Sequence, residues 1–214
     1  MKTTTNHQPR GQHSIFNSSL FVESKKAFGW ISAYGVGQHS AADFNPSSTA
    51  TDLLTANAKY QMALGQIPDL WQVCFDLYST FNNADAPFNA LQFIPVLRKL
   101  NSISEAEMEL FLRNPETNHI LIHNELIKVV LIHWHPGKTS GIHGHPKGGC
   151  VFKVLYGSIE EMRYTSGPSP QLLSVSKCEK GAMGYIDDQM AYHAVGNPFE
   201  TSAVSLHVYT PGPK

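Results

Sequence analysis

The sequence has too few cysteines for a disulfide framework and no segment that would cross a membrane. Cys74, Cys150 and Cys178 are the only cysteines among 214 residues, which fits a protein kept in a reducing compartment. No apolar run approaches the roughly 20 residues that a bilayer-spanning helix needs. Residues 1–14 are polar and lack the apolar centre of a signal peptide. These absences predict a cytoplasmic protein with no membrane partner.

An excess of charge of one sign is also absent. Lysine and arginine together number 16, against 17 for aspartate and glutamate, so the formal net charge is −1. This balance gives no electrostatic reason to expect nucleic acid as a partner. With 42% hydrophobic residues, the chain is long enough for one well-buried core. Its oligomeric state stays open, and a monomer is compatible with these properties.

The spacing of apolar residues divides the chain into three parts. Residues 1–50 begin with a polar stretch and end in a run rich in Gly, Ser, Thr and Ala, which predicts a flexible extension. Residues 51–115 are predicted to be helical, with one helix beginning at Ser104, where Glu107 completes a capping-box pattern. The other predicted helices cover residues 53–62, 70–81 and 91–97, where apolar residues recur at helical spacing.

The third part, residues 116–214, consists of short β-rich runs separated by Gly and Pro. Several short strands at this spacing are typical of a sandwich or barrel, so we predict a mainly β fold with an N-terminal helical part. The predicted strands are residues 120–122, 126–134, 151–156, 158–164, 171–176, 183–186 and 203–209.

His143 and His145 stand two residues apart in a glycine-rich run of this third part. A strand here would aim both imidazoles at one face, and two neutral imidazoles make half of a site for a first-row metal. Because the chain has eleven histidines, one such pair is unremarkable by itself. We interpret the other pair, His133 and His135, as structural.

The glycines and histidines of residues 137–157 resemble the first signature of the cupin superfamily, Gly-x5-His-x-His-x4-Glu-x6-Gly, with Cys150 at the position of the usual Glu ligand. This resemblance implies a cupin-type β-barrel, or jelly roll, that holds a metal. His193 is the best candidate for a third ligand. It lies between Gly181 and Asn197 in a weaker likeness to the second cupin signature, in which Pro and Gly are replaced and one residue is inserted.

Three histidines without a carboxylate leave open positions on a metal. The facial triad of non-haem iron oxygenases has two histidines and one carboxylate. Without the carboxylate, an iron is able to accept an anionic ligand such as a substrate thiolate together with dioxygen. A three-histidine zinc hydrolase satisfies the same ligand count, so the ligands alone do not identify the metal.

Two segments resemble sequences of the cysteine dioxygenase type I family, whose members are thiol dioxygenases of the cupin superfamily. Residues 150–157, CVFKVLYG, resemble the segment after the metal histidines, where this family has a Cys at the cupin Glu position. Residues 203–211, AVSLHVYTP, resemble the family's Ser-x-His-x-Tyr strand. The resemblance covers roughly the second half of the chain. It implies Fe(II) at the three histidines and a small thiol, cysteine first, as the substrate together with O2.

Ser205, His207 and Tyr209 share one face of the strand predicted over residues 203–209, because alternate residues of a strand do. The resemblance implies that the Tyr209 hydroxyl lies near the iron, is polarised by the His and Ser behind it, and hydrogen-bonds substrate or bound oxygen. It also implies that Cys150 and Tyr209 are able to form a thioether. A polar-lined barrel face without chemistry is the alternative interpretation.

One departure from the family bears on the substrate. The family's arginine that pairs with the substrate carboxylate has no counterpart, since the corresponding stretch, residues 116–119, contains Asn118 in its place. Arg113 and Arg163 are candidates to replace it. A small thiol carboxylate or an aminothiol is therefore the second expectation after cysteine.

Two other functional classes stay open. One is a cupin isomerase or hydrolase that uses zinc, nickel or manganese, for which turnover would not depend on oxygen. The other is a non-catalytic cupin that binds a small molecule as a sensor or scaffold. The pattern around Cys150 and Tyr209 disfavours both.

Overall fold

The computed structural model describes residues 62–81, 88–100, 103–123 and 126–212. The predicted extension, residues 1–50, and nearly all of the predicted helix over residues 53–62 lie outside these ranges. Within the described ranges, none of the helices combines the length and the apolar character that spanning a bilayer requires.

The helical elements follow the predicted apolar spacing. They are α4 (Asp69–Phe81), η3 (Ala90–Phe93), α5 (Ile94–Arg98) and α6 (Glu105–Leu112). The buried face of α4 contains five residues at helical spacing: Leu70, Val73, Cys74, Leu77 and Phe81. At the start of α6, the Ser104 side chain accepts a hydrogen bond from the Glu107 N–H at 3.2 Å, and the Glu107 carboxylate accepts one from the Ser104 N–H at 3.0 Å. The predicted capping box is confirmed.

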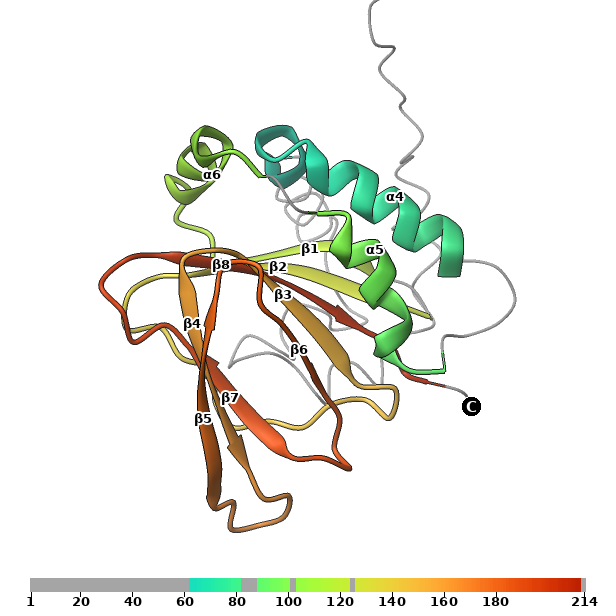
Figure 1. Ribbon diagram of the computed structural model, residues 1–214, viewed down its shortest axis with the longest axis vertical. Coiled ribbons are helices and arrows are strands. Elements are labelled where there is room, and N and C mark those ends of the chain that lie inside the picture. The colour runs from blue at the N-terminus through green and yellow to red at the C-terminus, as the bar shows by residue number, and fades with distance from the viewer. Residues whose placement is uncertain (1–61, 82–87, 101–102, 124–125, 213–214) are drawn as a thin grey trace, which may run out of the picture.

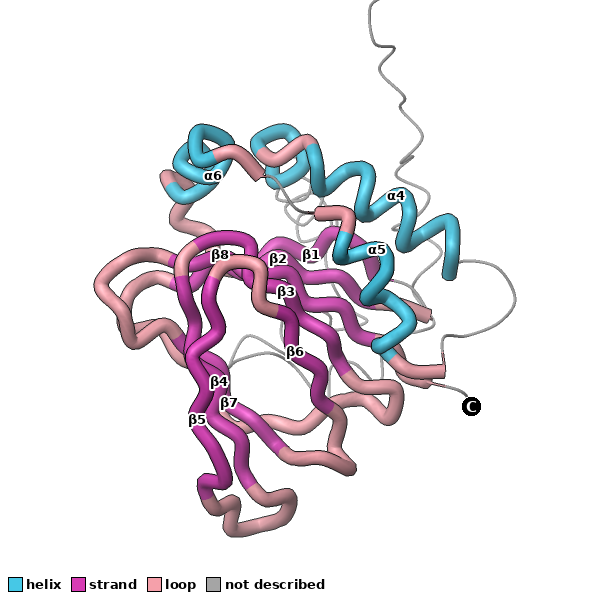
Figure 2. Tube along the Cα trace, viewed as in Figure 1, coloured by secondary structure: helices cyan, strands magenta, loops and turns pink. Residues whose placement is uncertain are grey.

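In the part of the chain that the structure describes, eight strands form two antiparallel sheets (Figures 1 and 2). The larger sheet has five strands in the order β1-β2-β8-β3-β6, and the smaller has three in the order β5-β4-β7. The strands are β1 (Asn118–His123), β2 (Lys128–Trp134), β3 (Cys150–Tyr156), β4 (Ser158–Tyr164), β5 (Leu172–Glu179), β6 (Met183–Ile186), β7 (Tyr192–Gly196) and β8 (Ala203–Tyr209).

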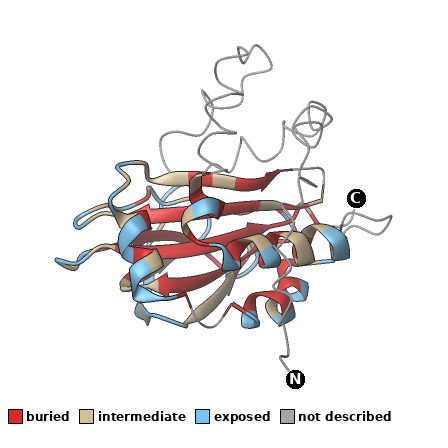
Figure 3. Cartoon of the chain, turned by 90° about the horizontal axis from the view of Figure 1, so that it is seen from above, coloured by how far each residue is buried: buried red, intermediate tan, exposed pale blue. Residues whose placement is uncertain are grey.

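The central strands of the five-stranded sheet, β2, β8 and β3, are buried on both faces because helices cover one face and the barrel interior lies against the other (Figures 1 and 3). In β8, every residue from Ala203 to Tyr209 is buried. Its alternate side chains separate into two groups: Leu206 and Val208 pack with the helices, whereas Tyr209 packs with Cys150 inside the barrel. The continuous burial of this strand follows from its position at the centre of the sheet.

The expected fold class, mainly β and cupin-type with an N-terminal helical part, is confirmed. The strands over residues 158–164, 183–186 and 203–209 have the predicted bounds. Strand β7 was not predicted, because it directly follows a turn and its sequence, YHAVG, does not alternate apolar and polar residues. The helices and the large sheet share one apolar core, so the helical part packs on the barrel rather than having a separate core.

Candidate metal centre

Backbone hydrogen bonds join β7 to the loop between β2 and β3, which is distant from it in the sequence. His143 and His193 pair as an antiparallel bridge, with N–H to O distances of 2.9 and 3.0 Å in the two directions. Further along the same two segments, Ser140 N–H donates to the Val195 carbonyl at 2.8 Å. Residues 50 positions apart in the sequence, 143 and 193, thereby become neighbours.

Strand alternation, which the spacing of His143 and His145 suggested, does not position these residues. They belong to the loop between β2 and β3, in which His143 makes only the single bridge to β7. The loop is shaped by Asp188, whose carboxylate accepts a hydrogen bond from the backbone N–H of His145. A Cβ at Gly144 would lie 2.6 Å from the same carboxylate, so a side chain there would displace it. A close backbone approach to Asp188, rather than strand alternation, aims the two imidazoles.

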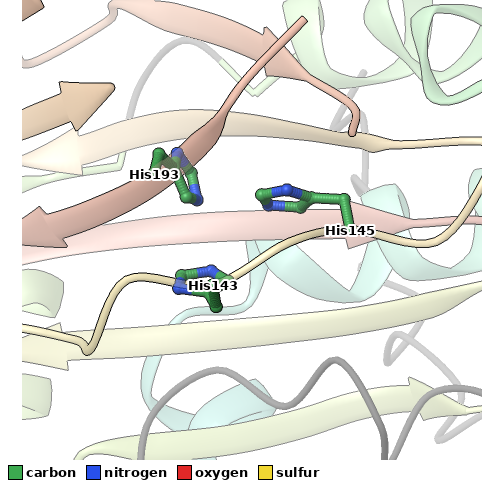
Figure 4. A group of neighbouring side chains, drawn as sticks. All are labelled: His143, His145 and His193. Atoms are coloured by element: carbon green, nitrogen blue, oxygen red, sulfur yellow. The ribbon is translucent and has the colours of Figure 1, made fainter. Parts of the chain in front are cut away.

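Three imidazoles converge inside the barrel, as Figure 4 shows. His143, His145 and His193 each offer one nitrogen, and these nitrogens all lie within 4.8 Å of one another. Ring centroids are 5.2 Å apart for His143 and His145, 4.7 Å for His143 and His193, and 4.5 Å for His145 and His193. His145 and His193 are each 1% exposed. The candidate ligands are thus brought together, while the other pair, His133 and His135, lies outside the group.

The donor set fits a metal. His143 Nδ1 contacts the Gly141 carbonyl at 2.9 Å, and His193 Nδ1 contacts Glu161 Oε1 at 2.9 Å, so in both residues the second nitrogen is left for a ligand bond. Neither ring nitrogen of His145 has a hydrogen-bond partner, although both are buried. An unpaired buried polar group is costly, and a metal ion bound by three nitrogens would remove that cost.

Burial keeps all three rings neutral. The pKa of His193 lies well below its usual value, first because the ring is desolvated and then because His143 is nearby. The pKa values of His143 and His145 are lowered by burial as well. Neutral imidazole is the form that binds metals, so the site needs no deprotonation near neutral pH.

Cys150 and Tyr209 are direct partners across β3 and β8. Burial raises the pKa of the Tyr209 phenol well above its usual value, and a hydrogen bond with the Cys150 thiol adds to the effect. The pKa of Cys150 is also raised by burial. The Tyr209 ring lies parallel to the His145 ring, with centroids 6.3 Å apart, so this cross-strand pair borders the three histidines.

Comparison with known proteins agrees with this constellation. The family model described as cysteine dioxygenase type I matches residues 71–213, which is more than half of the chain. This chain belongs to the cysteine dioxygenase type I family. The match includes all three histidines as well as Cys150 and Tyr209.

Curated relatives of the cysteine dioxygenase family cover part of the chain. Cysteine dioxygenase type 1 of Danio rerio is 32% identical over an alignment of 96 residues that covers 41% of this chain and 47% of that protein. The Homo sapiens protein of the same name is 31% identical over an alignment of 93 residues that covers 41% of this chain and 46% of that protein. The chain therefore spans about half the length of the curated relatives it matches. Among solved structures, a cupin 2 conserved barrel domain protein from Salinispora arenicola has a TM-score of 0.32 and 20% identity, covering 39% of this chain and 62% of that chain.

The strand typical of the cysteine dioxygenase family carries a hydrogen-bonded chain of side chains. Trp134 Nε1 donates to Ser205 Oγ at 2.7 Å, and Ser205 Oγ lies 2.8 Å from His207 Nε2. Since Ser205 accepts from the indole, its own proton is available to His207 Nε2, which favours the tautomer with a proton on Nδ1. His207 Nδ1 lies 4.0 Å from Cys150 Sγ. The three predicted residues therefore lie together, and the chain of contacts leads to the Cys150–Tyr209 pair.

The structure separates the two arginines proposed to replace the family's carboxylate-binding arginine. Arg113 is exposed at the end of α6, on the helix-covered side of the large sheet. Arg163 pairs with His193 across β4 and β7 and lowers the pKa of both His145 and His193 through its charge. Of these two arginines, only Arg163 stands near the three histidines. Asn118 lies at the start of β1 and brings no positive charge.

Sequence reasoning assigned no role to Glu161 and Asp188. Glu161 is 4% exposed and contacts both His193 and Arg163, whereas Asp188 holds the loop at His145. The spacing of two between Glu161 and Arg163 on a strand was the available local signal. Their contact with His193 depends on the register of β4 against β7, which the sequence does not reveal.

Proposed function

We propose that this protein is an iron(II)-dependent thiol dioxygenase that adds both atoms of O2 to the sulfur of a small thiol, with cysteine as the first candidate. The observation that carries the proposal is the convergence of three imidazoles, two of them fully buried, beside Cys150 and Tyr209 in a member of the cysteine dioxygenase type I family. In this reaction the thiol sulfur is oxidised to a sulfinate while both oxygen atoms of O2 are reduced and retained in the product.

His143, His145 and His193 are the proposed ligands of the iron. All three are neutral, so the positive charge of the metal would remain available to attract an anionic thiolate. Bound Fe(II) supplies the redox chemistry, which no side chain of the site possesses. The protein contributes the geometry of the ligands and a buried setting.

Tyr209 is proposed to orient the substrate. Because burial raises its pKa, the phenol keeps its proton and is able to donate a hydrogen bond to a group bound beside His145. Ser205 and His207 fix the position of Cys150, the cross-strand neighbour of Tyr209, through the series of contacts that begins at Trp134. The proposed role of all these residues is to fix one donor in a site from which water is excluded.

We also propose a cytoplasmic location and the division into an extension over residues 1–50, a helical part over 51–115 and a barrel over 116–214. All three cysteines are free thiols, which supports a reducing environment. The change from helices to strands falls between Leu112 and Asn118, which supports the second boundary.

Oxygen consumption tests the proposed function. The full-length protein loaded with Fe(II) should consume O2 only when a small thiol is added, with one sulfinate formed for each O2 consumed. An oxygen electrode and mass spectrometry of the product measure the two quantities. Turnover of a thiol-free substrate without oxygen would favour the zinc, nickel or manganese enzymes. Tight iron binding without thiol-dependent oxygen uptake would favour a non-catalytic cupin.

We predict that part of the protein carries a thioether between Cys150 and Tyr209, because β3 and β8 hold the two side chains in contact. Forming the bond removes two hydrogen atoms, so the intact mass should fall by about 2 Da and a linked peptide should appear after digestion. Cys150→Ser should abolish the link and leave slower turnover. Cys178→Ser serves as the control, since this thiol lies on β5. Protein matured with iron, oxygen and an active thiol that shows no linked peptide would contradict the prediction.

We also predict weak selection for a carboxylate on the substrate. Removing one partner of a buried guanidinium–carboxylate pair costs about 2–5 kcal/mol. On the face of β1 that includes Ile120, Asn118 stands where the family has its arginine. The kcat/KM for cysteine should therefore exceed that for its decarboxylated aminothiol by less than about tenfold. Steady-state oxygen uptake with both thiols measures the ratio.

Two arginine variants extend this test. Arg113→Ala should change neither KM, because the side chain is exposed at the end of α6. If Arg163 holds the carboxylate, Arg163→Gln will raise the KM for cysteine much more than the KM for the aminothiol. A strong preference for cysteine that survives both substitutions would contradict the predicted effect of Asn118.

A further inference from the structure

A buried carboxylate beside the three histidines has no role in the proposed reaction. Glu161 is 4% exposed, and each of its two oxygens has its own partner. Oε1 contacts His193 Nδ1 at 2.9 Å, and Oε2 accepts a hydrogen bond from Arg163 Nε at 3.1 Å. With both oxygens bound, the carboxylate is fixed in position and orientation.

The register of two strands creates this arrangement. Strands β4 and β7 pair so that Arg163 stands opposite His193 and Glu161 opposite Val195. Since alternate residues of a strand share a face, Glu161, Arg163 and His193 all point to the same side of the small sheet. Glu160, the residue directly before Glu161, points to the other side of the sheet.

Arg163 connects Glu161 to the second sheet. Its Nη2 donates to the Tyr185 carbonyl of β6 at 3.0 Å, while its Nε binds Glu161 on the small sheet. The guanidinium therefore compensates the charge of the buried carboxylate and is itself held between the two sheets. The hydrogen bond to Tyr185 thus fixes the guanidinium more firmly than an ion pair between two residues of one strand would do by itself.

We propose that Glu161 is the positioning residue of the metal centre, and that Arg163 holds Glu161 in place. By accepting the Nδ1 proton, Glu161 fixes the tautomer of His193 that leaves Nε2 free for the metal and fixes the orientation of the ring. The carboxylate also makes the imidazole a stronger electron donor to a bound metal. This inference rests on the proposed metal site and does not depend on which thiol is oxidised.

Glu161→Gln in the full-length protein tests the inference. Glutamine has the size of glutamate, but it offers one acceptor oxygen and one NH2 group to two donors and carries no charge. Co(II) serves as the probe metal, and competition with a chelator gives its dissociation constant. We expect the constant to rise by about 10- to 100-fold and the visible absorption of bound Co(II) to change. With iron, the Fe(III)/Fe(II) midpoint potential should rise, because a weaker donor stabilises Fe(III) less.

Glu160→Gln is the matched control and should change none of these quantities. Unchanged Co(II) affinity, absorption and midpoint potential in a folded Glu161→Gln protein would overturn the inference and reduce Glu161 to a structural ion pair. If circular dichroism shows that this variant does not fold, Arg163→Gln replaces it, since it leaves Glu161 but removes its second contact. A loss of Co(II) affinity in Arg163→Gln, smaller than the loss expected for Glu161→Gln, would then support the inference. Unchanged affinity would overturn it.

The result is separable from the proposed activity. Weaker Co(II) binding in the variant, together with a wild-type protein that consumes no O2 with thiols, would support the role of Glu161 and reject the dioxygenase. Equal Co(II) binding by variant and wild type, together with thiol-dependent oxygen uptake, would support the dioxygenase and reject the role of Glu161.

Discussion

His193→Ala is expected to remove most bound iron and to reduce thiol-dependent oxygen uptake by more than about 100-fold. Removing a residue that only hydrogen-bonds a metal ligand costs about 10- to 100-fold in affinity or activity, and removing the ligand itself should cost more. The substitution removes one of the three converging nitrogens and leaves Glu161 buried without its imidazole partner. Iron content by elemental analysis and oxygen uptake, measured on the same preparation, check both parts of the prediction.

His143→Ala and His145→Ala should have the same effect, since the three nitrogens form one group. His135→Ala is the matched control: it removes a histidine from the other His-x-His pair, which lies outside that group. Full iron occupancy in all three triad variants would exclude these residues as the ligands. Normal iron content with lost activity would instead assign them to the substrate.

Acidification is expected to destabilise the metal-free protein by at least about 4 kcal/mol between pH 7 and pH 5, the amount that His123 and His207 alone contribute. Burial lowers the pKa of His123 to about 3 and that of His207 to about 3, against about 6.5 in an unfolded chain. Below pH 6.5 the unfolded state therefore binds protons that the folded state does not bind. Each histidine loses about 1.4 kcal/mol of stabilisation per pH unit as the pH falls from 6.5 towards 3.

Urea unfolding of the metal-free protein at pH 7, 6 and 5 measures this dependence. His207→Gln should show a shallower decline with pH than the wild type, although it begins from a lower stability because Ser205 loses one of its two hydrogen-bond partners and keeps only Trp134. A free energy of unfolding that is equal at pH 7 and pH 5 would contradict the prediction. The comparison requires metal-free protein, since a bound metal would add its own dependence on pH.

Local sequence patterns were sufficient for the elements whose signals repeat within a few residues. The apolar spacing of residues 70–81 predicted α4, and the Ser104–Glu107 pattern predicted the start of α6. Alternation also placed Ser205, His207 and Tyr209 on one face of β8, because the period of a strand is independent of its neighbours.

The same reasoning failed where the chain is irregular. The spacing of His143 and His145 suggested a strand, yet the segment is a loop held by the Asp188 carboxylate from 43 positions further along. Strand β7 shows no alternation of apolar and polar residues, so its pairing with β4 and with His143 decides its conformation more than its own composition does. Contacts this distant leave no periodic signal in the sequence.

The sequence by itself determined the fold class, the candidate ligands and the family resemblance, because glycine spacing, histidine spacing and apolar periodicity are local properties of the chain. Only the tertiary structure decided which side chains meet. Antiparallel register places Cys150 opposite Tyr209, His143 opposite His193 and Arg163 opposite His193. Register depends on how the two sheets pack on each other inside the barrel and how the helices pack on the large sheet, so the positions of Glu161 and Arg163 at the metal centre were not available from the sequence.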